Sequence, residues 1–329
     1  MQPIRFGILG AGAIAAHFVQ ALRAVEGAEL AAVASRDLEK AQRFAAEHGA
    51  ARAHGSYRAL AEDPGVDIVY VATITPFHEE HVLLCLNAGK AVLCEKPFAV
   101  NAAQARRMAD CAVRNGVLLM EAMWTRYLPA TQQARRWVRE GAIGEPKMLF
   151  ANLNVSVPFD PASRLQDISI AGGAALDIGC YVVAEAFCLM GAPVAGSAQA
   201  QIGVTGVDVQ DAMILRHEGG GLSILTAAMH TVTPCDAAVY GTEGAVLLPG
   251  FQGATAAILR RNGAAEQRFE QEPLANGFEY EIREAVRCFR EGRTETPYLP
   301  LRESVAIMEA LDGFRRDFGL RYAVAGEAE

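Results

Sequence analysis

The sequence has no surplus of basic residues, no long apolar run and no closely spaced cysteine pair. Its 30 lysines and arginines are outnumbered by 38 aspartates and glutamates, so the formal net charge is −8. We therefore expect neither a nucleic-acid partner nor an anionic membrane partner, because no basic excess is available to neutralise phosphates. No apolar stretch is long enough to cross a bilayer.

The seven cysteines argue against a zinc-binding protein and against a disulfide-bonded secreted protein. Their number is odd and most of them lie within apolar runs, without the spacing of a zinc site. This pattern predicts reduced, buried thiols in a cytoplasmic protein rather than a disulfide framework. No signal peptide is expected, because the strand-like run IRFGILG begins at residue 4.

The chain of 329 residues is too long for one compact core, so two domains are expected. Apolar strands alternate with helices through the first third, which predicts a doubly wound parallel sheet, a Rossmann domain, over residues 1–121. After residue 121 the strands follow one another without helices, which predicts an α+β domain with a mostly antiparallel sheet over 122–329. The strands between 194 and 260 have too few helices to cover both faces, so a homodimer or higher oligomer is expected.

The stretch GILGAGAIA follows the first strand and opens the first helix. Gly10 and Gly12 suit a tight turn and the close approach of a pyrophosphate to a helix N-terminus. Ala13 and Ile14 open that helix and are predicted to contact the cofactor. The alternative is a tight strand–helix turn that binds nothing.

Ser35 and Arg36 end the second strand, where an NAD site would place an acidic residue. A hydroxyl and a guanidinium suit the 2′-phosphate of NADP, which we therefore favour, with NAD possible. Asp37 is expected to cap the next helix. The alternative for Arg36 is a solvated side chain with no ligand.

Two further strands end in polar residues at the carboxyl edge of the sheet, where open α/β folds bind ligands. The stretch VATITPFHEEHV places Thr73, Pro76 and His78 there as predicted cofactor contacts. A histidine at a helix start is usually polar surface, and no metal site is predicted.

The stretch CEKP ends the other strand with Glu95 and Lys96 before Pro97, which turns the chain through what could be a cis bond. Charges at the end of a buried strand are costly unless they are paired or used. Lys96 is expected to point into the cleft between the domains and to assist proton transfer.

A second polar group lies in the apolar stretch GGAALDIGCYVV. Asp177 and Tyr181 are four residues apart, so both would lie on one face of a helix over 174–189 and could meet a substrate hydroxyl. The alternative is a helix-start aspartate and a packed tyrosine. Trp124 and Arg126 either pack at the hinge or border the nicotinamide and a sugar-like substrate.

Taken together, GILGAGAIA, TPFHEEHVLLCLNAGKAVLCEKP and GGAALDIGCY resemble the Gfo/Idh/MocA oxidoreductases over nearly the whole chain. Within that family, MEAMWTRYLPA followed by GGAALDIGCY is most similar to the dimeric dihydrodiol dehydrogenases, which also act as NADP-dependent D-xylose dehydrogenases. The resemblance implies a Rossmann domain followed by an open, mostly antiparallel sheet whose far face forms the oligomer interface.

The same resemblance assigns roles to residues. The family's Glu-Lys-Pro motif corresponds to Glu95–Pro97, and its Asp-x-Gly-x-His motif corresponds to Asp177–Tyr181, with tyrosine in place of histidine. This implies that Tyr181 is the general acid–base, that Lys96 supports it and that Asp177 orients the pair. The expected activity is hydride transfer between NADP and a sugar or cyclic diol. The alternatives are a glycosidase- or lyase-like member with tightly held NAD and a non-catalytic NADP-sensing regulator.

Overall fold

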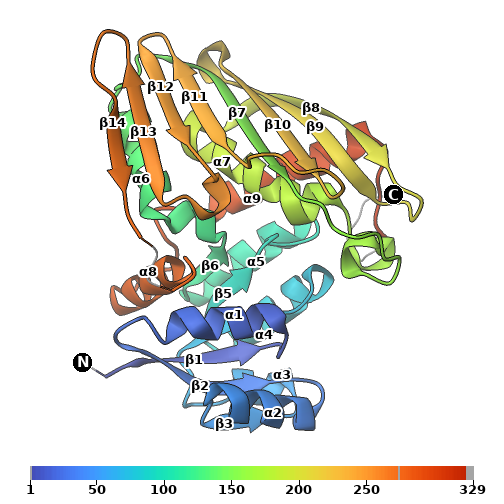
Figure 1. The fold of residues 1–329 in the computed structure, drawn as a ribbon. Coiled ribbons are helices and arrows are strands. Elements are labelled where there is room, and N and C mark those ends of the chain that lie inside the picture. The colour runs from blue at the N-terminus through green and yellow to red at the C-terminus, as the bar shows by residue number, and fades with distance from the viewer. Residues whose placement is uncertain (1, 273–274, 324–329) are drawn as a thin grey trace. The chain divides into compact units, whose positions relative to one another are not determined.

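The computed structural model describes residues 2–272 and 275–323, which form two compact units (Figure 1). The first unit contains the described residues of Met1–Ala99, Ala103–Trp124 and Pro273–Val305. The second contains those of Val100–Ala102, Thr125–Glu272 and Ala306–Glu329. None of the helices in these described residues is both long and apolar enough to cross a membrane.

The first unit is built on a six-stranded parallel sheet with the order β3-β2-β1-β4-β5-β6. The order reverses between β1 and β4, which is the switch point at which doubly wound sheets bind ligands. The predicted Rossmann sheet is therefore confirmed. Its strands and helices are β1 Ile4–Leu9, α1 Ala13–Leu22, β2 Ala28–Ala34, α2 Leu38–His48, β3 Arg52–His54, α3 Tyr57–Ala61, β4 Ile68–Val71, α4 His78–Asn87, β5 Ala91–Glu95, α5 Ala102–Asn115, β6 Leu119–Ala122 and α8 Glu279–Arg290.

Local signals at the helix ends act as the sequence predicts. Asp37 caps α2, because its side chain accepts a hydrogen bond of 3.2 Å from the backbone N–H of Lys40. Gly49 ends the same helix in the left-handed conformation, at φ 80°.

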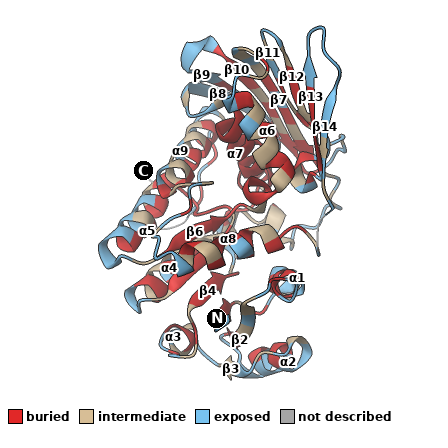
Figure 2. Ribbon diagram, turned by 90° about the vertical axis from the view of Figure 1, so that its left-hand side faces the viewer, coloured by how far each residue is buried: buried red, intermediate tan, exposed pale blue. Residues whose placement is uncertain are grey.

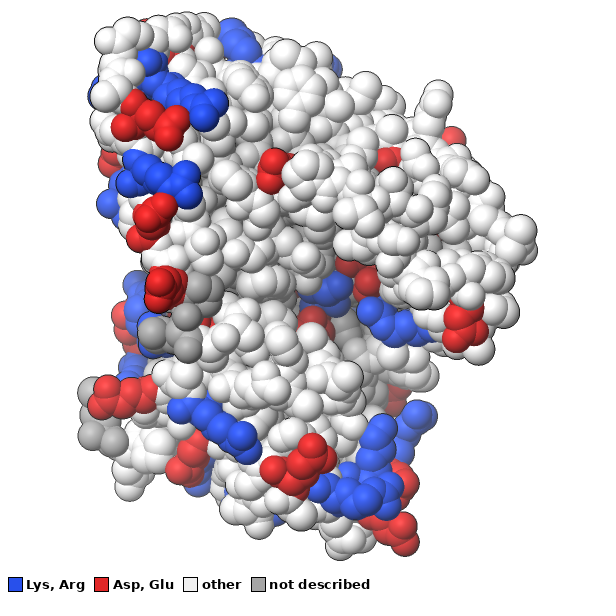
Figure 3. Space-filling view, in the orientation of Figure 1, with Lys and Arg blue, Asp and Glu red and all other residues white. Residues whose placement is uncertain are grey.

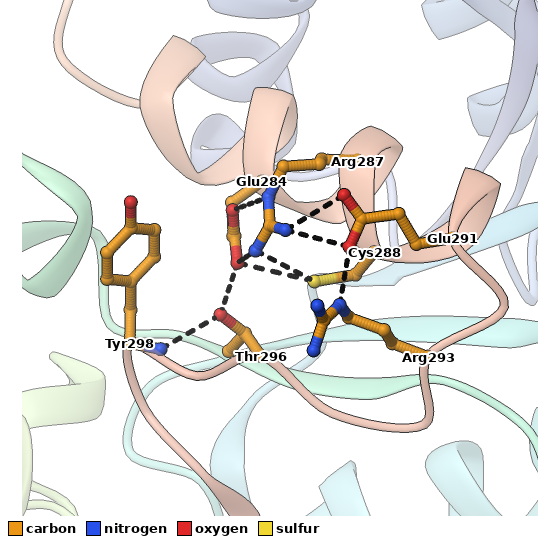
Figure 4. Close-up of polar contacts among 7 residues, drawn as sticks. All are labelled: Glu284, Arg287, Cys288, Glu291, Arg293, Thr296 and Tyr298. Carbon is orange, nitrogen blue, oxygen red and sulfur yellow. Dashed lines mark hydrogen bonds and ion pairs between the residues drawn. The ribbon is translucent and has the colours of Figure 1, made fainter.

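Helix α8 lies in the first unit, although the sequence-based boundary at residue 121 assigns everything after it to one C-terminal domain. A polar cluster joins this helix to the segment that follows it (Figure 4). Glu284 is paired with Arg287 at 2.6 Å and accepts a hydrogen bond of 2.5 Å from the hydroxyl of Thr296. Arg287 also pairs with Glu291 at 2.8 Å. Helix α8 also packs against α1, and this contact between segments distant in sequence is one that composition does not reveal.

The second unit is built on an eight-stranded sheet with the order β14-β13-β12-β11-β7-β10-β9-β8. Only β7 and β10 pair in parallel among these described strands, so the predicted mostly antiparallel sheet is confirmed. Strand β14 was not predicted. The strands and helices are α6 Pro129–Arg139, β7 Pro146–Asn154, α7 Cys180–Met190, β8 Pro193–Ile202, β9 Asp208–His217, β10 Leu222–Ala228, β11 Ala237–Gly241, β12 Gly244–Leu248, β13 Ala256–Arg261, β14 Gln267–Glu270 and the part of α9 Leu301–Asp317 that follows Val305.

Helices cover one face of this sheet. Helix α7 packs against β7 and β10, and α6 packs against β12 and β13. Buried residues are concentrated on α7 and on the sheet beside it (Figure 2). On the other face, the side chains of Phe150 and Ile214 remain 42% and 47% exposed.

Candidate cofactor site and catalytic groups

The turn between β1 and α1 is shaped by two glycines. Gly10 has φ 110°, and a Cβ atom there would lie 2.9 Å from the carbonyl oxygen of Ala72, so a side chain does not fit. Gly12 is the N-cap of α1 and offers no side-chain cap. A Cβ atom on Gly12 would meet nothing within 4 Å, so this turn borders open space. Ala13 and Ile14 begin α1, as predicted.

The segment that follows β2, together with the first turn of α2, presents a hydroxyl and two cations. The Ser35 Oγ accepts a hydrogen bond of 3.2 Å from the Asp37 N–H and retains its own proton to donate. The Arg36 guanidinium lies 6.0 Å from the centre of the Phe77 ring. Lys40 follows in the first turn of α2. Sequence reasoning missed Lys40, although a second cation four residues after Arg36 was a usable signal.

These groups line one cavity of about 370 Å³ within the first unit. The cavity brings together five of the predicted cofactor residues, Gly10, Gly12, Ser35, Arg36 and Thr73, and its remaining lining is Ala11, Lys40, Tyr57, Ala72, Ile74, Phe77, Glu80 and His81. An uncapped helix N-terminus with open space before it suits a pyrophosphate, and a hydroxyl with two cations suits a 2′-phosphate. The residues present therefore fit NADP.

His78 lies between the loops that follow β4 and β5. Its Nε2 is 2.8 Å from the carbonyl oxygen of Thr73, and its Nδ1 is 3.0 Å from the carbonyl oxygen of Pro97. The ring is 1% exposed, and burial lowers its pKa. The expectation of polar surface is therefore wrong, because the neutral ring is enclosed between two backbone carbonyls, one of which accepts its single N–H. Pro76 lies just before, in the short helix Thr75–Phe77.

His81, one helical turn later, is also buried. Its Nδ1 lies 3.0 Å from the hydroxyl of Thr73, and its ring packs edge-on against Tyr57 at 4.5 Å between centres. Burial, followed by the charges of His78 and Arg36, lowers the pKa of His81 to about 4. His81 is therefore a neutral wall of the cavity at physiological pH.

Glu95 ends β5 as a buried carboxylate that is fully engaged. The hydroxyl of Tyr70 donates to one oxygen, and the backbone N–H of Lys96 donates to the other at 3.1 Å. Lys96 is joined to Pro97 by a cis peptide bond. Glu281 of α8 is also buried, and burial together with the charge of Glu95 raises its pKa well above the usual value. The Glu95 carboxylate at the end of β5 therefore holds the backbone N–H of Lys96.

Trp124 and Arg126, which are close in sequence, belong to different units. The Trp124 ring is centred 5.2 Å from that of Phe278 in the first unit. Arg126 is fully buried in the second unit and donates a hydrogen bond of 3.1 Å to the carbonyl oxygen of Ala184. Burial raises the pKa of the Glu185 carboxyl to about 7, although the nearby positive charge of Arg126 lowers it. The cofactor roles of both residues stay predictions.

Asp177 and Tyr181 lie on consecutive helical segments of the second unit. Residues Ala175–Gly179 form a π-helical turn, and the α-helix α7 begins only at Cys180, so the expected continuous α-helix is wrong at its first turn. Such wide turns often occur at functional sites. Asp177 accepts a hydrogen bond of 2.8 Å from Arg164, and the Tyr181 side chain is buried at 6% exposed. Sequence reasoning missed Arg164, which carries no local signal.

The described residues contain no group of three or more histidine, cysteine, aspartate or glutamate side chains that could hold a metal ion.

Comparison with known families gives two matches that follow the two parts of the chain. Residues 4–123 match the family described as "Oxidoreductase family, NAD-binding Rossmann fold". Residues 131–247 match the "GFO/IDH/MocA C-terminal domain".

Curated relatives match over almost the full length. The trans-1,2-dihydrobenzene-1,2-diol dehydrogenase of Mus musculus is 37% identical and covers 97% of this chain and 98% of its own. The protein of the same name from Xenopus tropicalis is 34% identical and covers 97% and 99%. Among solved structures, the 3-ketoreductase KijD10 from Actinomadura kijaniata, in complex with NADP and TDP-benzene, is 28% identical, with a TM-score of 0.85 and coverage of 96% and 98%.

Proposed function

Because the chain belongs to the Gfo/Idh/MocA oxidoreductases, as its motifs predict, we propose that it is an NADP-dependent dehydrogenase of sugars or cyclic trans-diols. The observation that carries the proposal is the cavity that joins the glycine turn to Ser35, Arg36 and Lys40 at the carboxyl edge of a Rossmann sheet. The substrate class rests on the full-length similarity to diol dehydrogenases and on the similar ketoreductase.

In the proposed reaction, the cofactor and individual residues of the chain have separate roles. A bound cofactor would supply the redox chemistry, with NADP⁺ as hydride acceptor for the hydroxyl-bearing carbon and NADPH as hydride donor for the carbonyl. Tyr181 takes the hydroxyl proton during oxidation and returns it during reduction. Asp177, which Arg164 holds by a 2.8 Å hydrogen bond, orients the phenol.

We propose that Lys96 supplies a positive charge to the proton transfer at Tyr181. A free phenol titrates near pH 10, and an adjacent ammonium favours the ionised form. The backbone N–H of Lys96 donates to buried Glu95 at 3.1 Å, which restrains the backbone from which the Lys96 side chain extends. Glu95 therefore serves as a positioning group for Lys96.

We also propose that the chain forms a homodimer or higher oligomer through the uncovered face of the eight-stranded sheet. Five apolar residues, one from each of five neighbouring strands, lie directly opposite one another on this face and are at least partly exposed: Ile214, Ile224, Phe150, Ala238 and Leu247. The surface over these strands carries few charged side chains (Figure 3). A second copy would remove this apolar row from water.

The seven cysteines are unpaired and six of them are buried, which supports the proposal of a reducing, cytoplasmic location.

The experiment is a spectrophotometric assay at 340 nm with NADP or NAD and a panel that includes D-xylose, other aldoses and trans-1,2-dihydrobenzene-1,2-diol. We expect turnover of added NADP with at least one sugar or diol, and much less in a Tyr181→Phe control. Product formation without net change in added cofactor would instead indicate the glycosidase- or lyase-like alternative. Cofactor binding without any turnover would indicate a sensor.

A further inference from the structure

Two buried aspartates on β9 lie on the same side of the sheet although they are three residues apart. Side chains alternate along a strand, so positions three apart normally face opposite sides. Here Ile202 of β8 pairs with Asp208 while Gln201 pairs with Gln210, which leaves Val209 as an extra residue. This bulge changes the phase of the strand and turns both Asp208 and Asp211 inward, at 0% and 1% exposed.

The bulge aims Asp208 at the start of the helical turn that carries Asp177. Its Oδ2 accepts a hydrogen bond of 2.5 Å from the backbone N–H of Ala175. Its Oδ1 occupies the space in which Gly173 would have a side chain, since a Cβ atom there would collide with it. Gly173 has φ 131°, so glycine is required both by backbone conformation and by this carboxylate.

Tyr322 holds the same turn at its other end. Its hydroxyl donates a hydrogen bond of 2.7 Å to the carbonyl oxygen of Gly172, and the Arg315 guanidinium lies 4.9 Å from the centre of its ring. Two hydrogen bonds within the second unit thus hold this short segment. Asp208 accepts from the Ala175 N–H, and Tyr322 donates to the Gly172 carbonyl. This arrangement restrains the backbone that leads directly into the π-helical turn.

Asp211 lies buried beside Asp208. Burial first, and then the charge of Asp208, raises the pKa of Asp211, and burial raises the pKa of Asp208 as well. Two carboxyl groups that share one buried place retain a proton between them at neutral pH. Whichever carboxyl holds that proton, one oxygen of Asp208 accepts from the Ala175 N–H.

We propose that Asp208 is a positioning residue for catalysis, which fixes the backbone of Gly173–Ala175 and thereby the places of Asp177 and Tyr181. The proposal rests on the proposed dehydrogenase function. Asp208 touches no reacting group and acts only through the turn that it holds.

The test compares Asp208→Ala with Asp208→Asn, which keeps an oxygen that can accept the Ala175 N–H. Asp208→Ala should lower kcat by about 10- to 100-fold, because small misplacements of catalytic groups have effects of that size. The Kd for NADP, measured by fluorescence, should stay within about 2-fold, since the cofactor cavity lies in the first unit. Asp208→Asn should recover most of the lost kcat. Gln210→Ala, on the exposed side of the same strand, is the matched control and should leave kcat unchanged.

A second measurement does not depend on any substrate. Hydrogen exchange should become faster in residues 174–181 of Asp208→Ala while the strands β11–β13 keep their protection. If the wild-type protein turns over no substrate, the proposed function fails. The exchange measurement then still tests whether Asp208 restrains the backbone of Gly173–Ala175. Unchanged exchange and unchanged kcat in Asp208→Ala would overturn the proposal.

If Asp208→Ala does not fold, two milder variants test the same hold. Tyr322→Phe removes only the hydroxyl that donates to Gly172 and should lower kcat several-fold with NADP affinity unchanged. Asp211→Asn keeps the size of the side chain and removes the second titratable carboxyl, and it should leave kcat nearly normal. A parallel loss of kcat and of NADP affinity in Asp208→Asn or Tyr322→Phe would indicate general destabilisation and would refute a positioning role.

Discussion

His78 bridges the ends of two neighbouring strands, with its Nδ1 atom 3.0 Å from the carbonyl oxygen of Pro97 and its Nε2 atom 2.8 Å from that of Thr73. A neutral imidazole has one N–H to donate. Burial lowers the pKa of His78, so the ring does not bind the proton that would give it a second N–H. The ring therefore spans the carboxyl edge of β4 and β5, where the cofactor cavity lies, without carrying charge.

We expect His78→Ala to lower the free energy of unfolding by about 1–3 kcal/mol, because one buried carbonyl loses its N–H donor and the buried ring is removed. The Kd for NADP should rise by about 10-fold, a change of ~1.4 kcal/mol, as the loop at Thr73 loosens. Urea unfolding and fluorescence titration measure the two effects. The control is His230→Ala, at an exposed histidine in the second unit. Normal NADP affinity in His78→Ala would show that the bridge does not shape the cavity.

A pH effect on stability should follow from His81. Its pKa is about 4 in the folded chain and near 6.5 in the unfolded one, so the unfolded state binds more protons between these values. The stability contributed by neutral His81 is present above pH 6.5 and is lost as the pH falls towards 4. The difference in unfolding free energy between wild type and His81→Asn should therefore shrink over this window. A difference that stays constant between pH 7.5 and pH 4.5 would contradict the buried neutral state.

The choice of cofactor should depend on Arg36 and Lys40. Arg36→Ala should weaken NADP by about 10- to 100-fold, since a charge-assisted hydrogen bond to a phosphate is worth ~1.5–3 kcal/mol, and should change NAD much less. Lys40→Ala should act in the same direction. Arg43→Ala, an exposed arginine on the same helix, is the matched control. Equal losses for NADP and NAD would show that neither cation recognises the 2′-phosphate.

Lys96 and Tyr181 should behave as one unit. Tyr181→Phe keeps the ring and removes the hydroxyl, and it should cut kcat by about 100-fold or more while NADP affinity stays nearly unchanged. Lys96→Met should have a comparable effect, and the double variant should be little worse than either single one. Losses that multiply in the double variant would mean that the two groups work independently.

The uncovered sheet face should form the oligomer contact. Ile214→Glu places a charge at the β9 end of the apolar row, opposite Ile224, and should convert a dimer or larger species to monomer in light scattering at micromolar concentration. Glu218→Gln, in the turn after β9, is a control that leaves the row intact. A wild-type protein that is already monomeric would refute the proposed interface.

Much of this protein is determined by the sequence alone, because the signals are local. The alternation of apolar strands and helices predicts the Rossmann sheet, and the chemistry of Gly10, Gly12 and Asp37 predicts a turn and a cap that the structure contains. These features depend on backbone conformation and on neighbours only a few residues away. The motif around Lys96 is likewise readable, since a charge that follows a buried strand must be paired or used.

Other features were decided only by the tertiary structure. The burial of His78 depends on carbonyl oxygens from two separate loops, and the place of Lys40 in the cavity depends on how α2 packs beside β2. The inward turn of Asp208 depends on a one-residue shift between β8 and β9, which no periodicity reveals. In each case the deciding partner lies elsewhere along the chain or depends on packing. The free energy of burying a polar group is set by that partner and not by the residue's own neighbours in sequence.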